Sequence, residues 1–252
     1  MLIGLRKLSG PVALLFWCLS LQAGELHIAV ATNFSKAAQQ LATIFERQSG
    51  HLTVVSAGST GKLYAQIMNG APYDVFLAAD NRRPALLEER GKAIKGSRFT
   101  YALGRLVVWS RESDYVPETG MPDARSFTRL AIANPQLAPY GAAARETLQN
   151  LGIWKQEQPK IVRGESIGQT FQFVASGNVR LGFVARSQLP HGQGSAWLVP
   201  KEMHTPIEQQ AIILNDTSAA RAFAGFLQQT EARQLIRQSG YDLTNSEHAR
   251  IR

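Results

Sequence analysis

The sequence predicts an α/β protein built from two lobes, each a mostly parallel sheet flanked by helices, that are joined by a two-strand hinge. Three observations lead to this prediction. Short apolar runs alternate with amphipathic helical patterns, which is typical of βαβ units. A full βαβαβ pattern is complete by residue 102, and a fresh apolar strand begins at residue 106. The length of 252 residues, less a leader, suits either one large domain or two lobes of about 100 residues each.

The predicted strands are short apolar runs bounded by turn residues. They cover residues 27–31, 52–56, 75–78, 106–110, 130–133, 180–184, 196–199 and 210–214. The first predicted helix, 34–48, places Phe34, Leu41 and Phe45 on one face, and Gly50 follows where its last turn closes. Further helices are expected at 62–68, 84–90, 142–151, 167–175, 218–229 and 231–239, and most of them are followed by a glycine.

The lobe boundaries are expected where the chain crosses from one sheet to the other and where it returns. The crossing falls near residues 102–105 and the return near residues 206–210. Residues 25–103 with 207–252 then form the first lobe, and residues 104–206 form the second. Ligand clefts in open α/β sheets lie beyond the carboxyl ends of the strands. We therefore expect a binding site at those strand ends.

Residues 1–24 have the layout of a secretory signal peptide. Arg6 and Lys7 precede an apolar stretch at 12–21, and Ala23 is a small residue before the expected cleavage point. The stretch is too short for a membrane span, so the mature protein is expected in the periplasm, and a retained N-terminal anchor is the alternative. The only cysteine, Cys18, lies in this leader, so residues 25–252 form no disulfide and use no thiol chemistry.

The charge of the chain is moderately basic. It carries 27 basic and 19 acidic residues, a net charge of +8 that falls to about +6 without Arg6 and Lys7. The sequence contains no run of five like charges and no interleaving of basic with aromatic residues, which argues against a nucleic acid partner. This excess of positive charge either attracts anionic ligands through a mild electrostatic field or belongs to a solvated surface without function.

Two strand-to-helix junctions carry hydrogen-bond donors. Thr32 and Asn33 follow the first predicted strand, and Ser59 and Thr60 follow the second. A helix start gathers unpaired N–H groups and the positive end of the helix dipole, and hydroxyls add further donors, so such junctions suit an anion. A serine or threonine at a helix start is also an ordinary N-cap, and each junction taken singly allows that interpretation.

Two later junctions have the same form. Tyr140 and nearby amides lie between the strand 130–133 and the helix expected at 142. The segment 164–168 leads into the helix 167–175 and offers further amides. Alone, each is an ordinary loop. Together with the first two junctions they form a clamp in which both lobes offer donors to one ligand.

Signals for catalysis are weak by comparison. The histidines are scattered without metal-ligand spacing, at His27, His51, His191, His204 and His248. The segment 58–62 lacks both the Walker spacing and the G-x-S-x-G pattern. Asp74 and Asp80 flank one strand without a fixed facing geometry, and Asp80 is expected to cap the turn before Pro84 or to bridge the lobes. We expect no enzyme and no bound metal cation, and an exported enzyme acting on an anionic substrate is kept as an alternative.

Four segments combine these features: Ala31-Thr32-Asn33-Phe34, Ser56-Ala57-Gly58-Ser59-Thr60-Gly61-Lys62-Leu63-Tyr64, Asn69-Gly70-Ala71-Pro72-Tyr73-Asp74-Val75-Phe76-Leu77-Ala78-Ala79-Asp80 and Pro139-Tyr140-Gly141. With them, nearly all of residues 25–252 resembles the periplasmic molybdate-binding proteins of ABC transporters, which have the type II periplasmic binding-protein fold. The resemblance implies two lobes that close over a bare tetrahedral dianion, molybdate or tungstate, without any cofactor. It also implies a transient membrane permease as partner, and we expect a monomer.

By the same resemblance, the anion-binding residues are Thr32, Asn33, Ser59, Tyr140 and, through its backbone amide, Ile167. Some relatives have alanine and serine where this chain has Thr32 and Asn33, and they place a binding tyrosine at the end of the strand that here reads Gly182-Phe183-Val184-Ala185. Ala185 has no hydroxyl to supply that donor. If Tyr140 supplies it from its own loop, the number of donors is kept; if Tyr140 points away, the site has one donor fewer.

The donor-rich junctions also bear on which anion is bound. An oxyanion without protons has only acceptor oxygens, so its site should offer N–H and O–H donors and exclude carboxylates. None of the four junctions places Asp or Glu at a matched position, although Glu165 lies close to the fourth. Phosphate, which retains a proton at neutral pH, is thereby disfavoured. Sulfate is excluded by the resemblance alone, so a binding protein for sulfate or another solute is the alternative.

Overall fold

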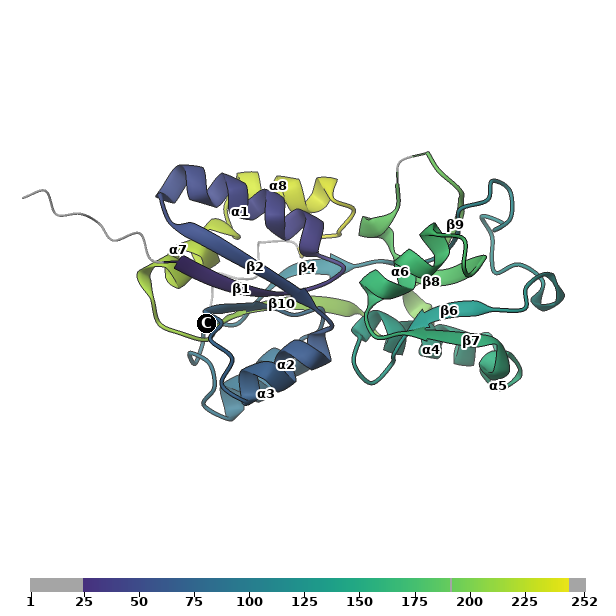
Figure 1. Cartoon of the computed structure of the whole chain (residues 1–252), viewed down its shortest axis with the longest axis horizontal. Helices are drawn as coiled ribbons and strands as arrows, with labels where there is room; N and C mark the ends of the chain where they lie inside the picture. Colours follow the sequence, from purple (N-terminus) through teal and green to yellow (C-terminus); the bar gives the residue numbers. More distant parts are fainter. Residues whose placement is uncertain (1–24, 191, 245–252) are drawn as a thin grey trace, which may run out of the picture.

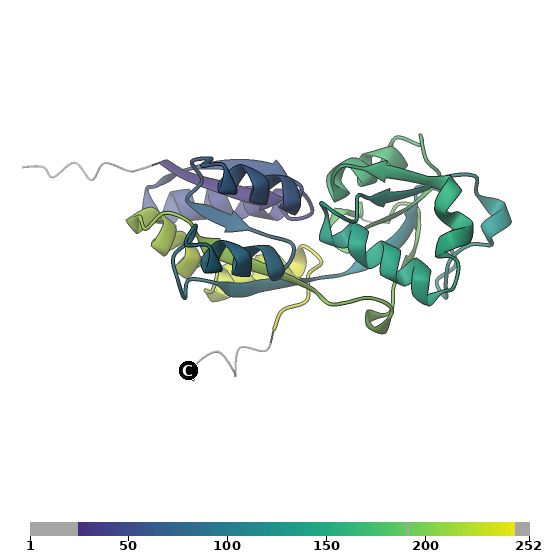
Figure 2. The same ribbon diagram turned by 90° about the horizontal axis from the view of Figure 1, so that it is seen from below.

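The computed structural model describes residues 25–190 and 192–244. The predicted signal peptide, His191 and His248 lie outside these residues. Two α/β lobes lie side by side along the long axis (Figure 1), and two chain segments run between them (Figure 2). The predicted two-lobe α/β fold is confirmed. No helix in the described part of the chain has the length and apolar character that a bilayer crossing needs.

The first lobe contains a five-stranded sheet with the order β2-β1-β3-β10-β4. Its strands are β1 (Glu25–Ala31), β2 (Leu52–Gly58), β3 (Val75–Leu77), β4 (Phe99–Gly104) and β10 (Ile207–Ile213), and its helices are α1 (Ser35–Ser49), α2 (Thr60–Met68), α3 (Arg82–Glu89), α7 (Ser218–Phe226) and α8 (Thr230–Gln238). Helices α1, α7 and α8 pack on one face of the sheet, and α2 and α3 pack on the other (Figure 1). Because β1 is covered on both faces, residues 28–31 form a continuous apolar run.

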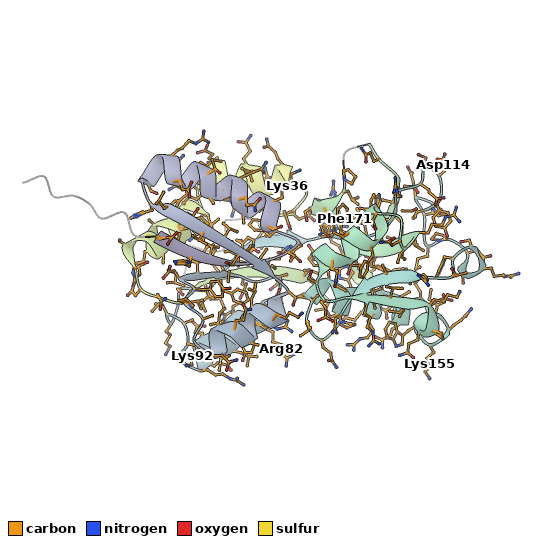
Figure 3. All side chains as sticks on the ribbon, viewed as in Figure 1. Lys36, Arg82, Lys92, Asp114, Lys155 and Phe171 are labelled. Atoms are coloured by element: carbon orange, nitrogen blue, oxygen red, sulfur yellow. The ribbon has the colours of Figure 1, made fainter. Side chains whose placement is uncertain are left out.

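The second lobe contains a five-stranded sheet with the order β7-β6-β8-β5-β9. Its strands are β5 (Leu106–Ser110), β6 (Leu130–Ala133), β7 (Ile161–Gly164), β8 (Leu181–Ala185) and β9 (Ser195–Leu198), its α-helices are α4 (Pro139–Asn150), α5 (Trp154–Glu157) and α6 (Ile167–Ala175), and its short 3₁₀ turns are Ala124–Ser126, Gln158–Lys160, Arg186–Gln188 and Lys201–Met203. Helix α6 covers one face, where Phe171 (Figure 3) stacks on Trp109 with ring centroids 5.4 Å apart. Helix α4 packs on the opposite face through Ala144 and Leu148.

Each sheet has one strand that is antiparallel to the other four. This strand is β10 in the first lobe and β5 in the second, and each is antiparallel to both of its neighbours. The remaining pairs are parallel. Strands β10 and β5 are also the two that enter a lobe directly after a crossing, because β4 passes to β5 through Arg105 and β9 passes to β10 through residues 199–206. Lobe boundaries at residues 103–104 and 206–207 agree with these crossings and stay our proposal.

Three details of the structure differ from the sequence prediction. Strands β4 and β7 were not predicted; β7 has only four residues, and Arg163 within it is exposed. Helix α4 begins at Pro139 and not at residue 142, because proline is well suited to the first helical position, where no N–H is needed. Tyr140 therefore lies in the first turn of α4, and the prediction that it lies in a loop is wrong.

Candidate functional site

The strand ends of both lobes meet at a small cavity in the seam between the lobes. It is lined by Ala31, Thr32, Asn33, Gly58, Ser59, Thr60 and Ala79 from the first lobe and by Ala138, Pro139, Tyr140 and Ile167 from the second. All five predicted site residues line the cavity. Their contact with a ligand stays a prediction.

Ser59 and Thr60 approach the cavity from the start of α2. Ser59 is the N-cap of this helix, and its Oγ accepts a hydrogen bond from Lys62 N at 3.4 Å. Because the hydroxyl acts as an acceptor in that bond, its own proton is free to be donated elsewhere. Thr60 Oγ1 accepts from Ala79 N at 3.2 Å and so ties the start of α2 to the end of β3. The N-cap interpretation and a binding role are therefore compatible at Ser59.

Thr32 reaches the second lobe directly. Its Oγ1 accepts a hydrogen bond from Gly168 N in the first turn of α6 at 3.1 Å, which again leaves the hydroxyl proton free. A Cβ atom on Gly168 would lie 3.0 Å from Thr32 Cβ, so only glycine fits here without displacing its neighbour. The lobes are thus in close contact beside the cavity.

Asn33 is held by residues behind the cavity. Its Nδ2 donates to Gln209 Oε1 at 2.8 Å and to Tyr241 Oη at 3.1 Å, and its backbone oxygen accepts from Tyr241 Oη at 2.7 Å. The side-chain amide hydrogens of Asn33 are therefore committed within the protein. Its backbone N–H remains as the donor that this residue has available.

Tyr140 is buried, with 1% of its surface exposed. Its hydroxyl oxygen accepts a hydrogen bond from Gln209 Nε2 at 3.3 Å. Burial raises the pKa of Tyr140 well above its ordinary value, and burial likewise raises the pKa of Tyr101 and Tyr241. These three residues, which we call the tyrosine cluster, consequently stay neutral, and the Tyr140 hydroxyl keeps a proton that it can donate.

Ile167 is the first residue of α6, and Ser166 is its N-cap. Ser166 Oγ accepts from Gln169 N at 3.1 Å, so the cap satisfies the third N–H of the helix and leaves that of Ile167 unused. The Ile167 side chain is buried and contributes to the apolar core of the second lobe.

Backbone N–H groups are the most uniform feature of the cavity. Among the described residues, no hydrogen-bond acceptor is found for the N–H groups of Asn33, Ser59, Thr60, Tyr140 and Ile167, all of which line it. Three of these groups belong to the first turns of α2, α4 and α6, where the helix dipoles add partial positive charge. Buried N–H groups are nearly always paired in proteins, so this arrangement is suited to a ligand made of acceptor atoms.

Within the described residues, no carboxylate lines the cavity. Glu165 forms an ion pair with Lys62 across the seam at 2.9 Å, and both side chains are half exposed. Asp80 accepts from Arg83 N at 2.9 Å and pairs with its guanidinium, whose Nη2 donates to Gln136 O in the second lobe at 2.7 Å. Asp80 thus caps the turn, as predicted, and also holds an arginine that bridges the lobes.

Charged side chains elsewhere are spread over the outer surface. Arg82, Lys92 and Lys155, labelled in Figure 3, are exposed and lie on the outside of the two lobes. No group of three or more His, Cys, Asp or Glu side chains in the part of the chain that the structure describes is arranged to hold a metal ion. The cavity is therefore distinguished by partial positive charges and not by full ones.

Two α/β lobes joined by two chain segments, with a small donor-lined cavity in the seam, define a solute-binding protein. The chain belongs to the bacterial extracellular solute-binding protein family, whose model matches residues 26–242. It is 46% identical over 230 residues to the molybdate-binding protein ModA of Azotobacter vinelandii, an alignment that covers 88% of this chain and 91% of that protein. It is 43% identical over 223 residues to ModA of Rhodobacter capsulatus, covering 87% and 88%.

The solved structure of the periplasmic molybdate-binding protein of Azotobacter vinelandii has the same fold. The two structures superpose with a TM-score of 0.83 at 40% identity, over 87% of this chain and all of that one. The resemblance to periplasmic molybdate-binding proteins that the four sequence segments predicted is confirmed.

Proposed function

We propose that this protein captures molybdate or tungstate between its lobes and delivers the anion to a membrane ABC permease. The observation that carries the proposal is the convergence of five unpaired N–H groups from both lobes on a cavity without carboxylates. An oxyanion that has no proton at neutral pH needs hydrogen-bond donors and no carboxylate beside it, and the described lining of this cavity fits both needs. The molybdate-binding relatives at 46% and 43% identity support molybdate as the ligand.

Each of the five site residues predicted from the sequence has a role in this proposal. Thr32 and Ser59 donate through their hydroxyl protons, Asn33 and Ile167 through their backbone N–H groups, and Tyr140 through its N–H and its hydroxyl. Because these donors belong to both lobes, the anion binds the closed state better than an open one and stabilises closure by a hinge motion. In this proposal the protein binds no metal cation, because molybdenum or tungsten enters as its oxyanion, and no cofactor takes part.

Other ligands are less well supported. Phosphate retains a proton at neutral pH and is best received by a carboxylate acceptor, which the lining of the cavity lacks. Sulfate is smaller than molybdate, because sulfur–oxygen bonds are shorter than molybdenum–oxygen bonds, so a rigid ring of donors discriminates by size. The named relatives do not favour sulfate. An exported enzyme would need a nucleophile, an acid–base pair or a metal at the cavity, and we propose a purely binding role.

The setting follows from the same proposal. The protein is exported to the periplasm by its N-terminal signal peptide, acts as a monomer and meets the permease transiently. It has no nucleic acid partner.

A thermal-shift series tests the proposal directly. The protein comprising residues 25–252 is melted alone and with molybdate, tungstate, sulfate or phosphate at equal concentrations. A ligand present at 100 times its dissociation constant adds about 2.7 kcal/mol of stability, a rise in melting temperature of about 5 to 10 °C for a chain of this size. A rise with molybdate and tungstate and none with sulfate is expected. A rise with sulfate or phosphate alone would contradict the proposal.

A further inference from the structure

Gln209 is a buried polar residue that the proposed set of ligands does not include. It lies on β10, two residues after that strand begins, and is completely shielded from solvent. The pairing of β10 with β4 shifts register between Gln209 and Gln210, which indicates a bulge at this point. Bulges redirect side chains, and this one lies close to the place where the chain returns to the first lobe.

The carboxamide of Gln209 makes three hydrogen bonds to other side chains. Its Oε1 accepts from Asn33 Nδ2 at 2.8 Å and from Tyr101 Oη at 3.2 Å, and its Nε2 donates to Tyr140 Oη at 3.3 Å. Buried polar groups that are fully paired fix a unique local arrangement, whereas an unpaired member is costly. Gln209 therefore locks two residues that line the cavity, one from each lobe.

We infer that Gln209 is a positioning residue for the oxyanion, acting through Asn33 and Tyr140. The inference rests on the proposed function and adds a residue to it. By holding the Asn33 side chain, Gln209 fixes the turn that presents the Asn33 backbone N–H. By donating to Tyr140, it occupies the phenol oxygen as an acceptor, so the phenol proton is the group left for the ligand.

The bond to Tyr140 also connects the two lobes. Tyr140 belongs to α4 of the second lobe, whereas Gln209 belongs to the sheet of the first. Gly104, the last residue of β4, lies against both side chains, and a Cβ atom there would overlap the Tyr140 hydroxyl. The donor geometry of the cavity is consequently tied to the position of the lobes beside the hinge.

Gln210 offers a matched control. It is the next residue of the same strand, is also buried, and makes comparable bonds, with Nε2 donating to Thr100 Oγ1 at 3.1 Å and Oε1 accepting from Arg98 at 2.9 Å. None of its partners lines the cavity. Loss of Gln210 therefore removes a buried carboxamide without touching the proposed ligands.

The experiment compares Gln209→Met with Gln210→Met in the protein of residues 25–252. Molybdate affinity is measured by titration calorimetry, and stability by the melting temperature without ligand. Both variants are expected to melt lower, but only Gln209→Met should weaken molybdate binding, by about tenfold for one to two lost orienting hydrogen bonds. Gln209→Asn, one methylene shorter, serves as a milder variant if Gln209→Met does not fold, and the same direction is expected.

Equal affinities of wild type and either Gln209 variant would overturn the positioning role, as would an equal loss for Gln210→Met. Wild-type protein that fails to bind molybdate or tungstate would instead overturn the proposed function, so the two failures are distinguishable. Tyr140→Phe, alone and combined with Gln209→Met, checks the route. Because Gln209 acts partly through Tyr140, the combined loss should be smaller than the product of the single losses, and a fully multiplicative loss would contradict that route.

Discussion

Replacing Ser59 by alanine tests the donor model at one atom. Ser59 Oγ accepts from Lys62 N at 3.4 Å, so its proton is available to a ligand in the cavity that it lines. The substitution removes a single oxygen, and 96% of the residue surface is already buried, so little else changes. We expect molybdate binding to weaken while the fold is retained.

The substitution is expected to reduce molybdate affinity much more than it reduces the stability of the fold. A hydrogen bond to a charged group contributes about 1.5 to 3 kcal/mol, so affinity should fall about 10- to 100-fold. The capping bond to Lys62 N is at the long limit for a hydrogen bond, so loss of the cap should cost only about 0.5 kcal/mol of stability. That corresponds to a melting temperature about 1 to 2 °C lower.

Thr217→Ala is the matched control for this measurement. Thr217 caps α7 in the same lobe through a 3.1 Å bond from Ala220 N, and it does not line the cavity. Its loss should lower the melting temperature by about 2 to 4 °C and leave molybdate affinity unchanged. Titration calorimetry on both variants decides the matter. An unchanged affinity for Ser59→Ala, or an equal loss for Thr217→Ala, would refute the donor model.

Four further predictions concern lobe closure, the ion pair, the pH dependence of binding and the pH dependence of stability. Gly168→Ala places a Cβ atom 3.0 Å from Thr32 Cβ across the seam. Calorimetry should therefore give about tenfold weaker molybdate binding, with a nearly unchanged melting temperature. An unchanged affinity would mean that the lobes need not approach so closely. Lys62→Ala removes a half-exposed ion pair to Glu165, so affinity should fall less than about fivefold, and still less at high salt. Molybdate affinity should stay constant from about pH 6.5 to 9, because burial raises the pKa of Tyr140 and no carboxylate lines the described cavity. A steady decline in affinity over that range would contradict a neutral phenol donor. Above about pH 10 the melting temperature should fall, because the unfolded chain ionises its tyrosines first while the raised pKa values keep the tyrosine cluster neutral in the folded protein.

The first-lobe side of the cavity was predictable because its signals are local. Thr32 and Ser59 each follow an apolar strand within one or two residues and precede a helix, so the chain itself brings donors to a strand end. The start of α4 was less apparent. Pro139 was a helix-start signal, but Pro135 four residues earlier made the whole segment resemble a loop, so Tyr140 was placed outside the helix that contains it.

The residues behind the cavity were not predictable from local pattern. Gln209 lies 176 positions from Asn33, and Tyr241 lies 208 positions from it. A glutamine in an apolar strand and a tyrosine after a helix carry no spacing that relates them to a distant turn. Only the return of the chain into the first sheet as β10, next to β3 and β4, brings these side chains together. Their contribution depends on topology, which a reading of single segments does not supply.

The polar character of the seam determines how closure depends on the ligand. The bonds that cross it include Gly61 N to Leu137 O at 2.8 Å and Gly168 N to Thr32 Oγ1 at 3.1 Å, and each contributes only about 0.5 to 1.5 kcal/mol, because water replaces it on opening. Apolar contact across the seam is limited: of the described first-lobe residues, Ala31, Ala79 and, where β10 begins beside the hinge, Ile207 join the core of the second lobe. Opening therefore exposes few apolar side chains. In the proposed function, an anion that accepts hydrogen bonds from both lobes is the contribution large enough to shift the equilibrium toward closure, because it binds the closed state better than an open one.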